Sequence, residues 1–94
     1  MLIRFLPVAA RDLESILSYV REDNPSAAET IKVSILGFLD LFAGFPDLGR
    51  ATAVQGVRFS PVPRLPCVVF YRRLDKELRI LRIRHARRRP LRLS

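Results

Sequence analysis

After a short apolar run at residues 2–6, the hydrophobic pattern of this chain changes its period once, close to residue 48, and that change limits the folds open to it. Upstream, apolar side chains recur at helical spacing, first over residues 8–23 and then from Asn24 to about Ala43. Downstream, short β-rich runs such as "CVVFY" alternate with turn residues. Strands are expected in four segments: residues 2–6, 55–60, 66–73 and 77–85. The expected element order is therefore β-α-α-β-β-β.

The boundary between the two helices is marked by the sequence "DNPS". Asn24 is a favourable N-cap, and Pro25 occupies the first helical position, where its missing N–H costs nothing. Gly44 gives the signal for the end of the second helix. A helical hairpin covering one face of a small, mainly antiparallel sheet is the economical arrangement for these elements. We therefore expect an α+β fold with two layers.

The length of 94 residues fits a single domain, residues 1–94, with a basic C-terminal tail at about 86–94. The single cysteine, Cys67, excludes an internal disulfide and a cysteine-based zinc site. No metal and no other cofactor is expected. The apolar stretch around "SILGFLDLFAGF" is interrupted by Asp40 and is too short to cross a bilayer. A cytoplasmic protein that does not enter the membrane is expected.

Charge is divided unequally along the chain. Residues 1–48 carry four basic and seven acidic side chains, a net charge of −3, whereas residues 49–94 carry thirteen basic and two acidic ones, a net charge of +11. The two parts together give the net charge of +8, and fifteen of the seventeen basic residues are arginine. Arginine favours bidentate contacts with phosphate or carboxylate, so a polyanionic partner is expected, either nucleic acid or an acidic protein.

The strand expected at 77–85 divides its side chains between two faces. One set comprises Arg79, Leu81, Ile83 and His85, and the other comprises Leu78, Ile80, Arg82 and Arg84. The set containing Leu81 and Ile83 is the better candidate for the core. Arg82 and Arg84 would then lie on the open face of the sheet, where Arg58 or Arg64 could join them. His85 would end the buried set at the rim, where a structural histidine is more common than a catalytic one.

Three apolar residues of the second helix fall outside its inward stripe, which consists of Ala28, Ile31, Ile35, Phe38, Leu39 and Phe42. Val33 lies nearly opposite that stripe, and Leu36 and Leu41 lie to either side of it. They are either ordinary exposed aliphatic residues or a docking face for a partner. A stand-alone nucleic-acid binder is the weaker interpretation of the basic half, because no aromatic residues are interspersed in it after Tyr71.

Several segments together resemble the RelE/ParE superfamily of bacterial toxins. These are the helix with "ARDLESILSYV", a second helix, "FPDLGR", the strand with "VVFYR" and the final "ELRILRIRHARR". The resemblance extends from Leu6 to about Arg89. It implies two helices on an antiparallel sheet and a toxin of a type II toxin–antitoxin system. It also implies a cognate antitoxin as partner, in a complex of heterotetramer size or larger.

The superfamily includes two activities, and the residues distinguish between them. RelE-like members are ribosome-dependent ribonucleases that cleave mRNA, whereas ParE-like members inhibit DNA gyrase. Metal-free RNA cleavage needs a base, an acid and cationic groups. If this chain is a ribonuclease, the candidates are Arg58, Arg64, Arg82 and His85, with Arg84 as a further cation. The C-terminal tail "ARRRPLRLS" lacks the tyrosine or histidine common in nuclease members, which favours the ParE-like branch with no catalytic residues.

Under this interpretation the arginine-rich half is a binding surface for DNA gyrase. The expected target-binding residues are Arg58, Arg82, Arg84, Arg87, Arg88 and Arg89. Val33, Leu36 and Leu41 are the expected antitoxin-binding residues. The ribosome with its mRNA is the alternative target.

Overall fold

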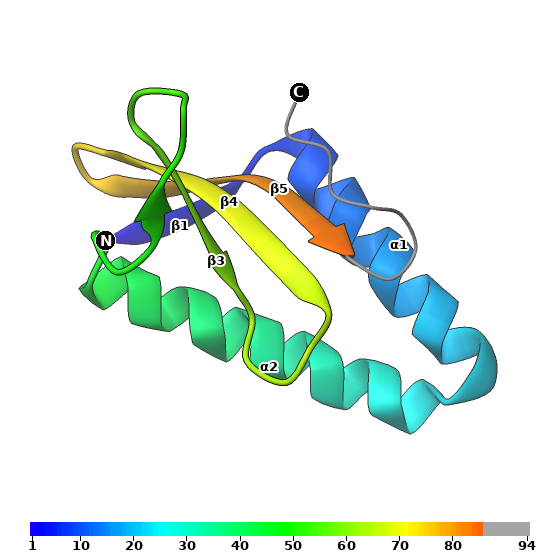
Figure 1. Cartoon of the computed structure of the whole chain (residues 1–94). Coiled ribbons are helices and arrows are strands. Elements are labelled where there is room, and N and C mark those ends of the chain that lie inside the picture. The colour runs from blue at the N-terminus through cyan, green and yellow to red at the C-terminus, as the bar shows by residue number, and fades with distance from the viewer. Residues whose placement is uncertain (86–94) are drawn as a thin grey trace.

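The computed structural model describes residues 1–85 and contains two helices and a five-stranded sheet (Figure 1). The elements in chain order are β1 (Leu2–Phe5), α1 (Pro7–Asp23), α2 (Pro25–Gly44), β2 (Arg50–Ala51), β3 (Val57–Pro61), β4 (Cys67–Leu74) and β5 (Glu77–His85). The expected α+β fold is confirmed, with every predicted helix and strand present. The short strand β2 was not predicted, because two residues are too few to show a period.

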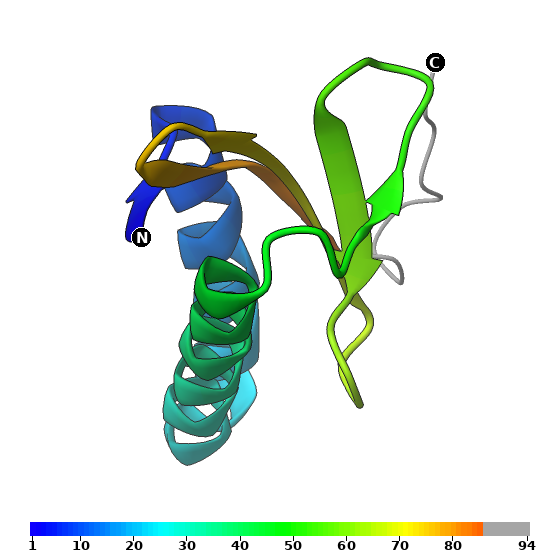
Figure 2. The ribbon, with the colours of Figure 1, turned by 90° about the vertical axis from the view of Figure 1, so that its left-hand side faces the viewer.

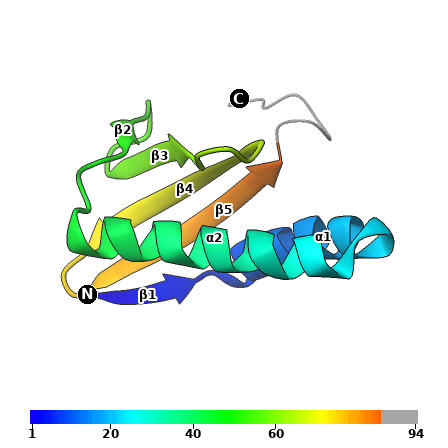
Figure 3. The ribbon, with the colours of Figure 1, turned by 90° about the horizontal axis from the view of Figure 1, so that it is seen from below.

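The sheet has the strand order β1-β5-β4-β3-β2. The first strand pairs in parallel with the last, so that Leu2 lies opposite Glu77 and Phe5 opposite Ile80. The other neighbouring pairs are antiparallel. Figure 2 shows both helices on the same side of the sheet, and Figure 3 shows α2 crossing the sheet, with β3 drawn above the helix and β1 below it. No helix in residues 1–85 covers the opposite side, which we call the open face.

The sequence signals around the helix junction act as expected. Asn24 caps α2, because its side-chain Oδ1 accepts a hydrogen bond from the backbone N–H of Ala27 at 3.0 Å. Both helices begin with a proline in the first turn. The inward stripes pack as predicted and form the core together with residues of the sheet. The buried helical residues are Ala9, Ile16, Leu17, Ala28, Ile35, Leu39 and Phe42.

The prediction for the buried face of β5 was wrong in part. Tyr71 pairs with Ile80, but Phe70 pairs with Arg82, so a β-bulge leaves Leu81 without a partner on β4. The bulge reverses the alternation of side chains along the strand. As a result Leu78 and Ile80 are fully buried before it, and Ile83 is buried after it. Leu81 remains only half-buried.

A loop at residues 45–50 is fixed to the sheet by Tyr71, which is completely buried. The Tyr71 hydroxyl accepts a hydrogen bond from the backbone N–H of Gly49 and donates one to the carbonyl of Pro46, each at 2.8 Å. Burial raises the pKa of this hydroxyl, which keeps it protonated and able to donate. Gly49 is required for this approach, because a Cβ atom there would overlap the Tyr71 ring and hydroxyl.

Two glycine-to-alanine substitutions are expected to change stability in opposite directions. Gly49→Ala should lower the free energy of unfolding by roughly 1–3 kcal/mol, because the methyl group displaces Tyr71. Gly37→Ala, in the exposed middle of α2 with nothing within 4 Å of the new Cβ, should raise it by about 0.5–1 kcal/mol. Urea denaturation followed by circular dichroism measures both. Equal effects of the two substitutions would contradict the role given to the Tyr71 contact.

Candidate functional site

The candidate site lies on the open face and along the outer edge of β5. Arg82 and Arg84 alternate with the buried Ile83, so the structure places them on the open face. Cross-strand pairing puts Arg82 opposite Phe70 and Arg84 opposite Val68. The sequence therefore predicted the position of both arginines correctly, although it placed Leu81 in the core instead of Leu78 and Ile80.

Asp12 of α1 fixes the edge of β5 beyond the end of β1. Its Oδ2 accepts hydrogen bonds from Arg82 Nε at 2.7 Å and from the backbone N–H of Ile83 at 3.0 Å, and its Oδ1 accepts from Arg82 Nη2 at 3.1 Å. Donation to this carboxylate raises the pKa of the Arg82 guanidinium. The contact satisfies an edge N–H that β1 does not reach. Arg82 is thus partly engaged inside the protein.

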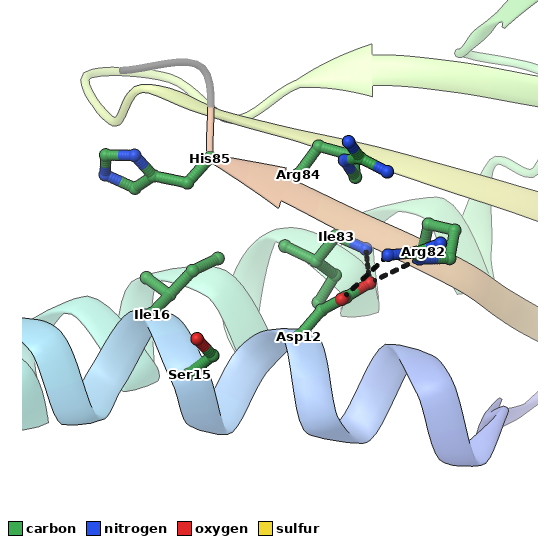
Figure 4. Close-up of a pocket in the computed structure, with 7 residues that line it drawn as sticks. All are labelled: Asp12, Ser15, Ile16, Arg82, Ile83, Arg84 and His85. Carbon is green, nitrogen blue, oxygen red and sulfur yellow. Dashed lines mark hydrogen bonds and ion pairs between the residues drawn. The ribbon is translucent and has the colours of Figure 1, made fainter. Parts of the chain in front are cut away.

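These groups line an open pocket of about 490 Å³ between α1 and the end of β5 (Figure 4). Its lining consists of Asp12, Ser15, Ile16, Arg82, Ile83, Arg84 and His85. His85 and Arg84 extend in opposite directions from the strand (Figure 4). The His85 ring lies against Tyr19 of α1, with ring centroids 6.5 Å apart at 61°. His85 therefore lies on the helix side at the rim, as the sequence predicted.

Arg58 does not lie beside Arg82 and Arg84. It pairs with Tyr71, which places it on the helix side of β3. Its Nη1 donates to the carbonyl of Gly49 at 2.7 Å and to that of Asp47 at 3.4 Å. The expectation that Arg58 joins the open face is therefore wrong, because the register across β3 and β4 turns it toward the loop. Arg64 lies in the β3–β4 loop with a positive φ of 66°, outside the sheet.

The remaining predicted residues occupy separate regions. Val33, Leu36 and Leu41 are exposed on α2, with 62%, 38% and 45% of their surface accessible. Arg87, Arg88 and Arg89 lie outside the described residues. Cys67 is buried, and burial raises the pKa of its thiol, which disfavours the reactive thiolate.

Residues 1–85 contain no group of three or more metal-ligating side chains. Within the same part of the chain, neither helix is long and apolar enough to cross a membrane.

Comparison with known proteins identifies the family. The family model described as "ParE toxin of type II toxin-antitoxin system, parDE" matches residues 3–90. The chain belongs to this family of ParE toxins. The structure of a chain from "Chromosomal ParDE TA system from P. aeruginosa" has the same fold, with a TM-score of 0.79 and 27% sequence identity over 90% of this chain and 95% of that chain.

Two curated relatives are also named as toxins. The "Putative toxin Y4kP" of Sinorhizobium fredii is 30% identical over 84 residues, which are 89% of this chain and 86% of the relative. "Toxin RelE2" of Caulobacter vibrioides is 32% identical over 80 residues, which are 85% of this chain and 89% of the relative. The superfamily recognised in the sequence is thereby confirmed.

Sequence reasoning missed two parts of this ParE-family site. Nothing in the sequence indicates that Asp12 on the first helix meets Arg82 seventy residues later. Phe59 and Phe70 lie on different strands, so their stacking on the open face depends on a register that the sequence does not reveal.

Asp12→Ala is expected to destabilise the fold by about 1–2 kcal/mol, because it removes the acceptor of Arg82 and of the Ile83 N–H while Arg82 stays partly solvated. Glu14→Ala, also on α1, is the matched control. Its carboxylate only meets Arg21 at 3.3 Å on the surface, so the change should stay within about 0.5 kcal/mol. Chemical denaturation of both variants measures the difference, and equal losses would contradict the assigned role of Asp12.

Proposed function

We propose that this ParE-family toxin inhibits DNA gyrase by binding rather than by catalysis, in the bacterial cytoplasm. The observation that carries the proposal is the separation of Arg82 and Arg84 from His85 on opposite sides of β5. A ribonuclease that works without a metal needs a proton-transfer group beside its cationic groups. On the strands of the described chain, the open face carries arginines and only one carboxylate, Glu77, which is paired with Arg79 at 2.7 Å.

Arg84 is the strongest candidate for direct contact with the target. Within residues 1–85 it forms no ion pair or side-chain hydrogen bond, whereas Arg82 is bound to Asp12 and Arg58 holds the 45–50 loop. An unpaired guanidinium can bind a carboxylate or phosphate of a partner without first breaking an internal contact. In this proposal Arg84 and the tail residues Arg87, Arg88 and Arg89 bind gyrase. Arg82 adds to the charge, and Arg58 contributes by shaping the loop.

Inhibition by binding requires that the toxin prefer one state of the gyrase cycle over the others. A toxin with equal affinity for every state would change none of their populations. The proposal therefore includes a higher affinity for the gyrase–DNA complex that carries cleaved DNA.

A cognate antitoxin is the partner that the family implies. We propose that it contacts the exposed apolar residues Val33, Leu36 and Leu41 of α2, in a complex of heterotetramer size or larger. In the structure of residues 1–85 these three side chains are exposed on one helix. An exposed apolar helix surface is suited to packing against an amphipathic segment of a partner.

Pulse labelling of cells after induction of the toxin without antitoxin tests the target. DNA synthesis should fall before protein synthesis, and purified gyrase should lose supercoiling activity. A variant combining Arg84→Gln, Arg87→Gln, Arg88→Gln and Arg89→Gln should lose most of this effect while remaining folded by circular dichroism. Arg21→Gln on α1 is the control and should keep full activity. A folded quadruple variant that still inhibits gyrase would refute this assignment.

Ribosome-dependent mRNA cleavage is the second candidate. It is supported by the similarity to "Toxin RelE2" and by the pocket that His85 shares with Arg82 and Arg84. If it is correct, protein synthesis falls first and His85→Gln slows cleavage by about 10²–10⁴-fold, the usual contribution of one general acid or base. Primer extension on ribosome-bound mRNA measures the rate. Unchanged cleavage in this variant would exclude His85 from proton transfer.

A further inference from the structure

Two phenylalanines form a stacked pair on the open face. Phe59 of β3 and Phe70 of β4 are cross-strand partners, with ring centroids 6.0 Å apart at 30°. Both alternate with helix-side residues of their strands, and neither belongs to the hydrophobic core. Each remains partly exposed to solvent. An aromatic pair on this side of the sheet adds little to the core, so it calls for another explanation.

Arginines flank this pair on both sides along one row of the sheet. Arg50 of β2 pairs with Phe59, and Arg82 of β5 pairs with Phe70. The row therefore reads Arg50, Phe59, Phe70, Arg82 across four strands, with about 14 Å between its ends from the usual strand spacing. The row on one side contains Arg4, Arg79 and Arg72, and the row on the other contains Arg84. Cationic groups thus surround two aromatic rings.

The charge of this face is strongly one-sided. The five strands contain a single acidic residue, Glu77, which is already paired with Arg79 and Arg4. Six of the eight arginines in the strands share the open face by register, while Arg58 and Arg73 pair with the helix-side residues Tyr71 and Leu78. A ligand that lies across this face must carry several negative charges and present flat, apolar surfaces to the rings.

We propose that the open face binds single-stranded nucleic acid, with Phe59 and Phe70 stacking on unpaired bases and the flanking arginines holding the phosphates. Unpaired bases expose the π-faces that stack on aromatic rings, whereas bases in a duplex stack on one another. The sequence showed no interspersed aromatics after Tyr71, but the sheet places aromatic residues between arginines from different strands. Rings and phosphates are contacts that DNA and RNA share, so this chemistry fits both. The proposal goes beyond gyrase inhibition and does not depend on it.

Fluorescence anisotropy with the full chain, made by cell-free synthesis, tests the proposal. The probes are oligo(dT) and oligo(U) of about twelve nucleotides, within the usual length for such sites, and a duplex of the same length. At least one single strand should bind more tightly than the duplex. Phe70→Leu and Phe59→Leu should each weaken single-strand binding about tenfold, in the range of one lost base–aromatic contact. Phe45→Leu, at an exposed phenylalanine at the end of α2, should leave it unchanged.

The salt dependence of binding affinity distinguishes stacking contacts with bases from ionic contacts with phosphates. Arg84→Gln should reduce the slope of log affinity against log salt by about 0.7, the value for one phosphate contact on a single strand, whereas Phe70→Leu should leave the slope unchanged. Arg21→Gln should change neither slope nor affinity. Phe70→Tyr retains the ring and should retain binding, which keeps the test valid if Phe70→Leu fails to fold.

The outcomes divide clearly. Preference for oligo(dT) or for oligo(U) supports the site and identifies its source, DNA or RNA. Equal binding of duplex and single strands, no effect of the phenylalanine substitutions, or equally tight binding of poly(glutamate) would each show charge attraction alone and overturn the proposal. The assay contains neither gyrase nor ribosomes, so its failure is distinct from a failure of the proposed function.

Discussion

The β-bulge at Leu81 decides which side chains of β5 are buried and which face solvent. Before it, Leu78 and Ile80 point toward the helices, and after it Ile83 does so. Without the bulge, the alternation that buries Leu78 and Ile80 would turn Arg82 and Arg84 toward the core, where unpaired guanidinium groups are very costly. One extra residue therefore allows a strand with three arginines to lie between β1 and β4 in a packed sheet.

The arginines near this strand differ in what they are free to do. Arg82 is bound to Asp12 and joins α1 to the sheet edge, while Arg58 holds the 45–50 loop through backbone carbonyls. Arg84 has no such contact within residues 1–85. The net charge of the basic half thus overstates the charge available to a partner. Internal hydrogen bonds hold the guanidinium groups of Arg82 and Arg58 in place, so fewer arginines are free to bind a partner.

The two layers of the molecule differ in chemistry. The helices carry three basic and six acidic residues and expose the apolar side chains Val33, Leu36 and Leu41. The strands carry eight arginines and one glutamate. Two different kinds of partner suit these surfaces, an apolar segment on α2 and a polyanion on the open face. An antitoxin on α2 and a target on the sheet would contact opposite layers.

The sequence by itself determined every element except β2, the helix cap at Asn24, the inward stripes of both helices and the layered α+β fold, because these depend on local periods and on residues near one another in the chain. It also determined the exposed positions of Val33, Leu36 and Leu41. Only the tertiary structure decided on which side of the sheet Leu81 and Arg58 lie, that Asp12 contacts Arg82, and that Phe59 stacks on Phe70. Each of these depends on strand register or on packing between distant segments. A bulge of one residue reverses the side of the sheet to which the following side chains point.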